Sequence, residues 1–224
     1  MPQRPPRQLA FSLPHAESLS RDDFLEGPPN AAALALIERW PDWPNKAIAL
    51  VGPEGCGKSH LAAIWALNAG ARSMPAQALA ATDVPGSLAT GALVLADLQA
   101  EHFDENALFH LLNMARETNA YVLITARRPP LSLAVGLRDL RSRLRALPAV
   151  TMTAPDDALL RALIVKLCAD RQMLIDDGIV TFLIGRIERS YAAAREAVML
   201  LDAEALRLGR PVTRALAAEL LKAR

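Results

Sequence analysis

Several features that mark particular classes of protein are scarce or missing in this chain. Only two of its 224 residues are cysteine, Cys56 and Cys168. Two cysteines are too few for the disulfide framework of a small secreted domain, so we expect both to be reduced thiols. No apolar run is long enough to span a bilayer, and no apolar stretch follows Arg4 and Arg7 as a secretory signal would require. These absences indicate a cytoplasmic protein with no membrane partner.

An excess of charge is missing too. Lys and Arg number 25 and Asp and Glu 24, which gives a net charge of +1. Proteins that bind DNA usually carry a strongly basic face, so nothing in the composition requires a nucleic-acid partner, and the near-neutral charge agrees with an expectation of no direct sequence-specific DNA binding. A zinc-type site is not indicated either, because the four histidines lack metal-ligand spacing: His15, His60, His102 and His110.

Apolar residues are abundant, at 52% of the chain, and their pattern changes along its length. Residues 1–29 are rich in proline, which prevents long helices and central strands, so we expect a flexible N-terminal arm there. Short apolar runs then alternate with helical periodicity over residues 30–154, which favours an α/β domain with a parallel sheet. Only helical patterns remain over 155–224, which predicts a small helical domain.

The expected elements follow from apolar periodicity and from capping residues. Strands are expected at 47–51, 92–96, 121–125 and 149–152, with a weaker signal at 71–74. Helices are expected at 30–40, 61–69, 105–117 and 137–145, and in the second domain at 156–171, 176–187, 190–208 and 213–222. Asn30, Asp156 and Thr213 are suitable helix caps.

A glycine-rich segment joins the first expected strand to the next helix, Gly52-Pro-Glu-Gly-Cys-Gly-Lys-Ser59. It fits the pattern G-x-x-x-x-G-K-[ST], in the strand–loop–helix setting that this phosphate-binding loop requires. Its glycines let backbone N–H groups point at phosphate oxygens, Lys58 reaches the terminal phosphates, and Ser59 can bind Mg²⁺. The alternative is a glycine-rich turn without a ligand. We expect ADP or ATP with Mg²⁺, held by Gly52, Gly55, Cys56, Gly57, Lys58, Ser59 and His60.

Two further residues stand at the ends of expected strands. Asp97 is the expected second Mg²⁺ ligand, unless it only caps the segment that follows. Thr125 would lie near the terminal phosphate if its strand neighbours the strand before the glycine loop; otherwise it is an ordinary β-branched strand residue.

The residue after Asp97 bears on hydrolysis. Hydrolytic proteins of this kind usually have an acid there to orient the attacking water, and here the position is Leu98. Leucine can neither accept a proton nor orient water. The sequence therefore predicts nucleotide binding with weak intrinsic ATPase activity at most. Glu101 and Asp104 are the nearest possible substitutes, without support from their spacing.

Arg143 lies in an arginine-rich helical run with Arg138, Arg141 and Arg145. A run of charge is usually a solvated helix face. The other interpretation is an arginine finger, which places its permanently charged guanidinium on the transferring phosphoryl group of a neighbour's nucleotide.

Taken together, these segments resemble the DnaA-related AAA+ family, and above all its shortened members, the regulatory inactivators of DnaA (Hda). The resemblance covers nearly the whole chain. It rests on Gly52–Ser59, on the strand that ends at Asp97, on Leu123-Ile-Thr-Ala-Arg-Arg-Pro-Pro130 and on Gly136-Leu-Arg-Asp-Leu-Arg-Ser-Arg143. It implies an α/β AAA+ P-loop module with a five-stranded parallel sheet and a small C-terminal helical lid. It also implies that Arg143 is the arginine finger and Thr125 the sensor 1 residue.

The arm carries a second resemblance. Gln8-Leu-Ala-Phe-Ser-Leu13 is similar to a motif that docks in a hydrophobic groove of the DNA polymerase sliding clamp. In that interpretation Gln8 supplies a polar anchor, while Leu9, Phe11 and Leu13 fill apolar pockets. The alternative is a strand or hook packed on the core.

Two departures from the family pattern matter. The sequence ends at Arg224, just past the expected lid, so we expect no helix-turn-helix DNA-binding domain of the kind that replication initiators carry. The sensor 2 arginine of the family falls on Ala192, with Arg189 and Arg195 about one turn to either side. Either arginine is a candidate replacement, and the site would otherwise favour ADP or bind nucleotide weakly.

The resemblance predicts a nucleotide-binding regulator of chromosomal replication initiation. It would bind the sliding clamp and stimulate hydrolysis of DnaA-bound ATP through Arg143. The alternative is a self-sufficient AAA+ ATPase or loader that acts on another replication protein. A P-loop small-molecule kinase is disfavoured, because no base for a phosphate acceptor is evident. Head-to-tail homo-oligomers are a further possibility, as in other AAA+ proteins.

Overall fold

The computed structural model describes residues 19–79, 84–99 and 103–222. These residues form two compact units, 19–159 and 160–222. Each unit has its own core of buried apolar side chains. The two are described separately below.

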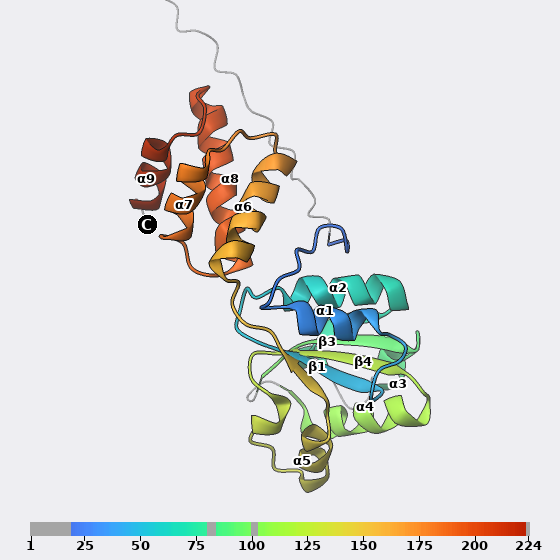
Figure 1. Ribbon diagram of the computed structural model, residues 1–224. Coiled ribbons are helices and arrows are strands. Elements are labelled where there is room, and N and C mark those ends of the chain that lie inside the picture. The colour runs from blue at the N-terminus through green and yellow to red at the C-terminus, as the bar shows by residue number, and fades with distance from the viewer. Residues whose placement is uncertain (1–18, 80–83, 100–102, 223–224) are drawn as a thin grey trace, which may run out of the picture. The chain divides into compact units, whose positions relative to one another are not determined.

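A five-stranded parallel sheet forms the centre of the first unit (Figure 1). Its strand order is β2-β3-β4-β1-β5. The strands are β1 (Ala47–Val51), β2 (Arg72–Pro75), β3 (Ala92–Leu98), β4 (Tyr121–Ala126) and β5 (Ala149–Thr151). Strands β1 and β4 are apolar along nearly their whole length because helices cover both faces of the sheet.

Helices pack on both faces of this sheet. Helices α1 (Ala31–Glu38) and α2 (Lys58–Ala69) lie on one face, and their buried side chains share a core with Ile48, Leu50 and Val94. Helices α3 (Val84–Ser87), α4 (Glu105–Glu117) and α5 (Arg138–Arg145) lie on the other face. The short 3₁₀ turns η1 (Ala76–Ala78) and η3 (Pro130–Ser132) complete the connections.

The second unit consists of α6 (Asp157–Asp170), α7 (Asp177–Ile184), α8 (Tyr191–Leu208) and α9 (Arg214–Lys222). Each helix begins at a side-chain cap, in which a carboxylate or hydroxyl accepts a backbone N–H bond. The caps are Asp156, Asp176, Ser190 and Thr213. Capping by Asp156 and Thr213 confirms two of the expected helix starts.

The α/β fold class expected from the sequence is confirmed, including the weakly indicated strand near residue 72. Two local expectations were wrong. Asn30 does not cap α1, because its amide accepts a bond from Gly27 N–H and donates one to the Leu25 carbonyl. Helix α2 begins at Lys58 rather than Leu61, because the glycine loop passes directly into its first turn. Helix α3 was not predicted, since Pro85 and Gly86 are poor helix formers.

Within the described residues, no helix combines the length and the apolar character needed to cross a membrane. Both cysteines are buried and free.

Burial makes the Cys168 thiol hard to ionise. Its side chain has no exposed surface, and desolvation by burial raises its pKa to about 11. In a Cys56→Ser variant, where Cys168 is the only thiol, we expect labelling by an uncharged thiol reagent at pH 8 to be about 100-fold slower in the native protein than in denaturant. Kinetics followed from pH 8 to 11 should show the native rate rising throughout. Equal rates in the native and denatured protein would contradict the burial.

Candidate functional site

The glycine-rich loop 52–59 connects β1 to α2, and its first residue packs closely against the backbone of Met152, just after β5. A Cβ atom at Gly52 would lie 2.4 Å from the Met152 carbonyl oxygen and 2.9 Å from the Cys56 sulfur, so no larger residue fits. Gly55 and Gly57 have φ angles of 71° and 98°, in the left-handed region that favours glycine. These constraints fix the turn of the loop toward the start of α2.

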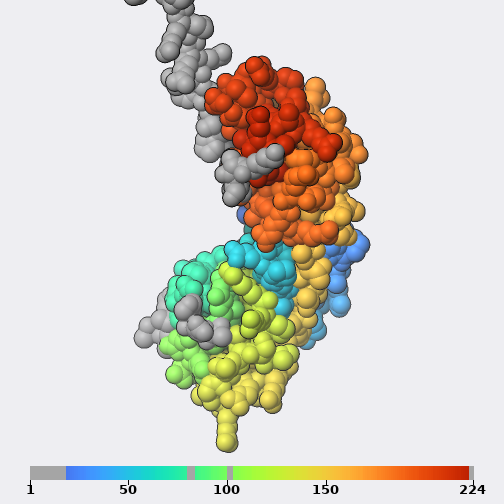
Figure 2. Space-filling model, turned by 90° about the vertical axis from the view of Figure 1, so that its left-hand side faces the viewer, coloured from blue at the N-terminus to red at the C-terminus, as the bar shows by residue number. Residues whose placement is uncertain are grey.

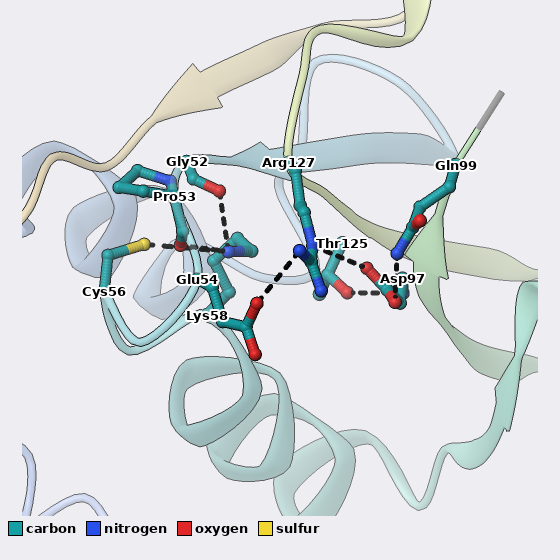
Figure 3. Close-up of polar contacts among 9 residues, drawn as sticks. All are labelled: Gly52, Pro53, Glu54, Cys56, Lys58, Asp97, Gln99, Thr125 and Arg127. Carbon is teal, nitrogen blue, oxygen red and sulfur yellow. Dashed lines mark hydrogen bonds and ion pairs between the residues drawn. The ribbon is translucent and has the colours of Figure 1, made fainter. Parts of the chain in front are cut away.

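Lys58 lies across the inside of this loop (Figure 3). Its ammonium donates hydrogen bonds to the carbonyls of Gly52, at 2.8 Å, and Pro53, at 2.7 Å, and lies 3.8 Å from the Cys56 sulfur. Gly57 is the N-cap of α2 and offers no side chain to the first N–H groups of the helix. Ser59 is exposed in the same turn. A fixed cation, a positive helix end and an accessible hydroxyl form a cradle that fits phosphate.

His60 is turned toward the segment before α1. Its Nε2 atom lies 3.0 Å from the Ser20 carbonyl oxygen, and its ring packs edge-on against Phe24 at 5.3 Å between centroids. This expected nucleotide contact therefore holds the 20–24 segment against α2.

Asp97 stands at a bulge in β3. Between the paired residues Leu95–Ile124 and Leu98–Ala126, β3 has one residue more than β4. The backbone of Asp97 takes a φ of 56°, a conformation that aspartate tolerates better than most residues. Its N–H donates to the hydroxyl of Thr125, at 2.9 Å. Since β4 lies directly beside β1, the strand adjacency assumed for Thr125 is confirmed, and its buried hydroxyl secures the turn that presents Asp97.

The bulge sends Leu98 into the core. Leu98 is 1% exposed and belongs to the apolar cluster on the α4 face of the sheet. Asp104, a possible substitute acid, is committed to capping α4, because its Oδ1 accepts the Ala107 N–H bond at 3.0 Å. Glu101 lies outside the described residues. Neither Leu98 nor Asp104 can therefore orient water beside Asp97.

Sequence reasoning missed three polar residues at this edge: Gln99 and Arg127, which contact Asp97, and Glu54, which pairs with Arg127 (Figure 3). Arg127, just past β4, lies 2.9 Å from a Glu54 carboxylate oxygen and 3.7 Å from Asp97 Oδ1. Gln99 donates to Asp97 Oδ2 at 2.5 Å. The signal was available, since Arg127 and Glu54 follow the carboxyl ends of adjacent parallel strands, which meet at one edge.

A cavity of about 350 Å³ adjoins this edge. It is lined at one end by Ser59 and Thr125, and beyond them by small and apolar side chains of α2 and β3, including Ala62, Ala66 and Val94. The start of α2, coloured cyan in Figure 2, lies at the surface of the first unit. Ser59 is therefore open to a ligand from solvent, whereas Thr125 lines the cavity from a buried position.

Arg143 is presented by α5, which is rigidly held. Leu140 and Leu144 are buried against the core, and both oxygens of Glu105 accept N–H bonds from Gly136 and Leu137 at the start of the helix. Arg141 turns back to donate to the Val135 carbonyl. Within the described part of the chain, no hydrogen bond or ion pair engages the Arg143 guanidinium.

The remaining predicted site residues lie in the second unit or outside the described residues. Ala192 and Arg195 lie in the first turns of α8, and Arg189 precedes the Ser190 cap; all three belong to the second unit. The residues of the clamp motif, Gln8, Leu9, Phe11 and Leu13, lie outside the described residues.

No model of a known protein family matches the chain, and no curated protein matches it in sequence. Solved structures do match. Domain III of the Thermotoga maritima replication initiation protein DnaA is similar over 91% of this chain and 95% of its own, with 19% identity and a TM-score of 0.74. AMPPCP-bound DnaA from Aquifex aeolicus is similar over 82% of this chain, with 18% identity and a TM-score of 0.65. The chain spans 64% of that longer protein.

A second group of neighbours is the Holliday junction branch migration motor RuvB from Thermotoga maritima. One RuvB structure is similar over 91% of this chain and 71% of its own, with 17% identity and a TM-score of 0.72. At such low identities these likenesses show the fold. The chain has the AAA+ P-loop fold that DnaA domain III and RuvB share.

Leu98→Glu should not create an ATPase, because its carboxylate would enter the apolar cluster on the α4 face. We expect the free energy of unfolding to fall by about 3 kcal/mol or more. Chemical denaturation would measure it, with Leu98→Met as the size-matched apolar control. Turnover of ATP by the isolated variant should not exceed that of the unaltered protein. A variant of unchanged stability with tenfold higher turnover would contradict the inward orientation of Leu98.

Proposed function

We propose that the chain is a nucleotide-binding regulator of chromosomal replication initiation, of the kind represented by the regulatory inactivators of DnaA. It binds ADP or ATP, with Gly52–Ser59 as the phosphate cradle. It docks on the sliding clamp through residues 8–13, and it stimulates hydrolysis of ATP held by DnaA through Arg143. The AAA+ fold and the likeness to DnaA domain III support the family context.

The proposal rests on two observations. The glycine loop can bind a nucleotide, and Arg143, which makes no hydrogen bond or ion pair within the described residues, lies on a different element, α5. The chain's own loop has the cradle of a nucleotide site, but Leu98 is buried where a water-orienting acid would be needed. Arg143 stands on α5, whose end leads into the start of β5, whereas the cradle follows the far end of the adjacent strand β1. This placement favours a nucleotide on a second molecule as the target of Arg143.

The choice of Arg143 over Arg141 also has support. The Arg141 guanidinium is held by the Val135 carbonyl of its own chain, so using it would break that bond. Arg143 carries no such contact within the described residues and is half-buried. The segment around α5, yellow at the lower end of Figure 2, lies on the surface of the first unit. A partner can therefore approach Arg143 without rearranging the helix.

In this mechanism the protein contributes the positive charge of Arg143 to the transition state of phosphoryl transfer. As the terminal phosphoryl group of the partner's ATP transfers to water, negative charge spreads over its oxygens. A guanidinium from outside stabilises that charge with two parallel N–H donors. The nucleotide in the chain's own cradle would stabilise the first unit in the shape that presents α5.

Arg143→Ala should abolish the stimulation. With ATP pre-bound to DnaA and the clamp loaded on DNA, we expect the unaltered protein to raise hydrolysis strongly and the variant to lose roughly 10³-fold of that rate. Arg143→Lys should lose most of it as well, because an ammonium lacks the planar fork. Arg138→Ala, which removes an exposed arginine from the first turn of the same helix, is the matched control and should retain full stimulation.

Two results would contradict this function. No stimulation by the unaltered protein on loaded clamp would remove the role in regulating DnaA. Robust ATP turnover by the isolated protein, dependent on Asp97, would instead indicate the self-sufficient ATPase or loader.

Docking on the clamp should depend on residues 8–13. Replacing Gln8, Leu9, Phe11 and Leu13 together by alanine should abolish binding to the isolated clamp, because the polar anchor and all three apolar side chains are lost. Nucleotide affinity and thermal stability should stay unchanged. Titration of labelled clamp would measure the affinity, with a variant altered only at Arg4 and Arg7 as the control. An unchanged affinity would remove clamp docking while leaving the role of Arg143 intact.

A further inference from the structure

Arg127 lies between the two carboxylates of the nucleotide site. Its guanidinium is 2.9 Å from Glu54, on the glycine loop, and 3.7 Å from Asp97, at the end of β3 (Figure 3). It is attached two residues beyond Thr125, whose hydroxyl secures the backbone of Asp97. Three strand ends thus converge on this side chain, because the strands are parallel and adjacent.

Both oxygens of the Asp97 carboxylate already face donors of the protein. Oδ2 accepts the bond from Gln99, and Oδ1 faces the Arg127 guanidinium. A divalent cation on this carboxylate would have to share it with a permanent positive charge a few ångströms away, which like-charge repulsion disfavours. The surroundings of Asp97 therefore fit Mg²⁺ poorly.

The same surroundings fit an anion well. Lys58 is fixed inside the loop by the Gly52 and Pro53 carbonyls, and Arg127 lies against the loop from the β4 side. A phosphate chain in the cradle would meet two side-chain cations, Lys58 and Arg127, instead of one lysine and a metal ion. The hold of Glu54 on Arg127 is weak, since the Glu54 side chain is 78% exposed. A phosphate oxygen can replace it as the partner of Arg127.

We infer that Arg127 takes the place of the divalent cation at this site. It binds the terminal phosphate of the chain's own nucleotide, so that ADP and ATP bind with little dependence on Mg²⁺. This inference rests on the proposed nucleotide binding and goes beyond it, because it names a resident cation for a site at which the loop pattern alone implies Mg²⁺.

Binding of ADP and ATP to the full-length protein, measured by calorimetry in excess Mg²⁺ and in excess EDTA, tests this inference. For the unaltered protein, we expect the affinities in the two conditions to differ by less than about threefold. Arg127→Ala should weaken binding in EDTA by about tenfold, from loss of a charge-assisted contact, and Mg²⁺ should restore part of the loss. Arg128→Ala, which removes the neighbouring exposed arginine, should bind as the unaltered protein does. Glu54→Ala should bind slightly tighter.

Each other outcome has a distinct meaning. Binding by the unaltered protein that collapses in EDTA would overturn the inference while leaving nucleotide binding intact. Tighter binding of nucleotide by Arg127→Ala would also overturn it, since the Arg127 side chain would then occupy the site and compete with the nucleotide. No binding of either nucleotide in either condition would remove the nucleotide site itself and with it the proposed function. Thermal melting of each variant separates loss of binding from loss of fold.

Discussion

The hydrogen bond between the Asp97 N–H and the Thr125 hydroxyl sets the character of the nucleotide site. It holds β3 in a bulge, so that Asp97 faces the strand edge and Leu98 enters the core beside α4. In a regular strand the alternation of side chains would have continued, and Leu98 would have followed Val94 and Ala96 onto the α2 face. Position 98, where a water-orienting acid would be expected, therefore lies in the packed core, so the site differs in orientation as well as in residue type.

Charge at this edge follows from the same geometry. Parallel pairing of β1, β3 and β4 brings Lys58, Glu54, Asp97 and Arg127 to one end of the sheet. Arg143 lies on a different element, anchored by Leu140 and Leu144 and by the Glu105 carboxylate. Under the proposed function, the molecule binds one nucleotide and acts on another, and these tasks use arginines on separate elements of the same unit.

Much of the fold could be predicted from short-range patterns. The apolar runs at 47–51 and 121–125 are buried strands because both sheet faces are covered, and the glycine loop begins where β1 ends. Capping residues located the starts of α6 and α9. The Asn30 side chain does not accept a hydrogen bond from the first turn of α1, because its amide is bonded to backbone groups of the preceding turn. Helix α3 was not predicted, because it is stabilised by the packing of Val84 in the core and not by helix propensity.

The sequence by itself determined the AAA+ fold class and the phosphate loop, because a strand, a glycine loop and a helix in succession are local features of the chain. It also indicated the unusual Leu98. Tertiary structure alone decided the orientation of Leu98, the engagement of Asp104 and Arg141, and the position of Arg127 between Glu54 and Asp97. Each of these depends on contacts across strands or turns whose partners no local pattern specifies, since a side chain's nearest polar partner is set by the packing of the whole unit.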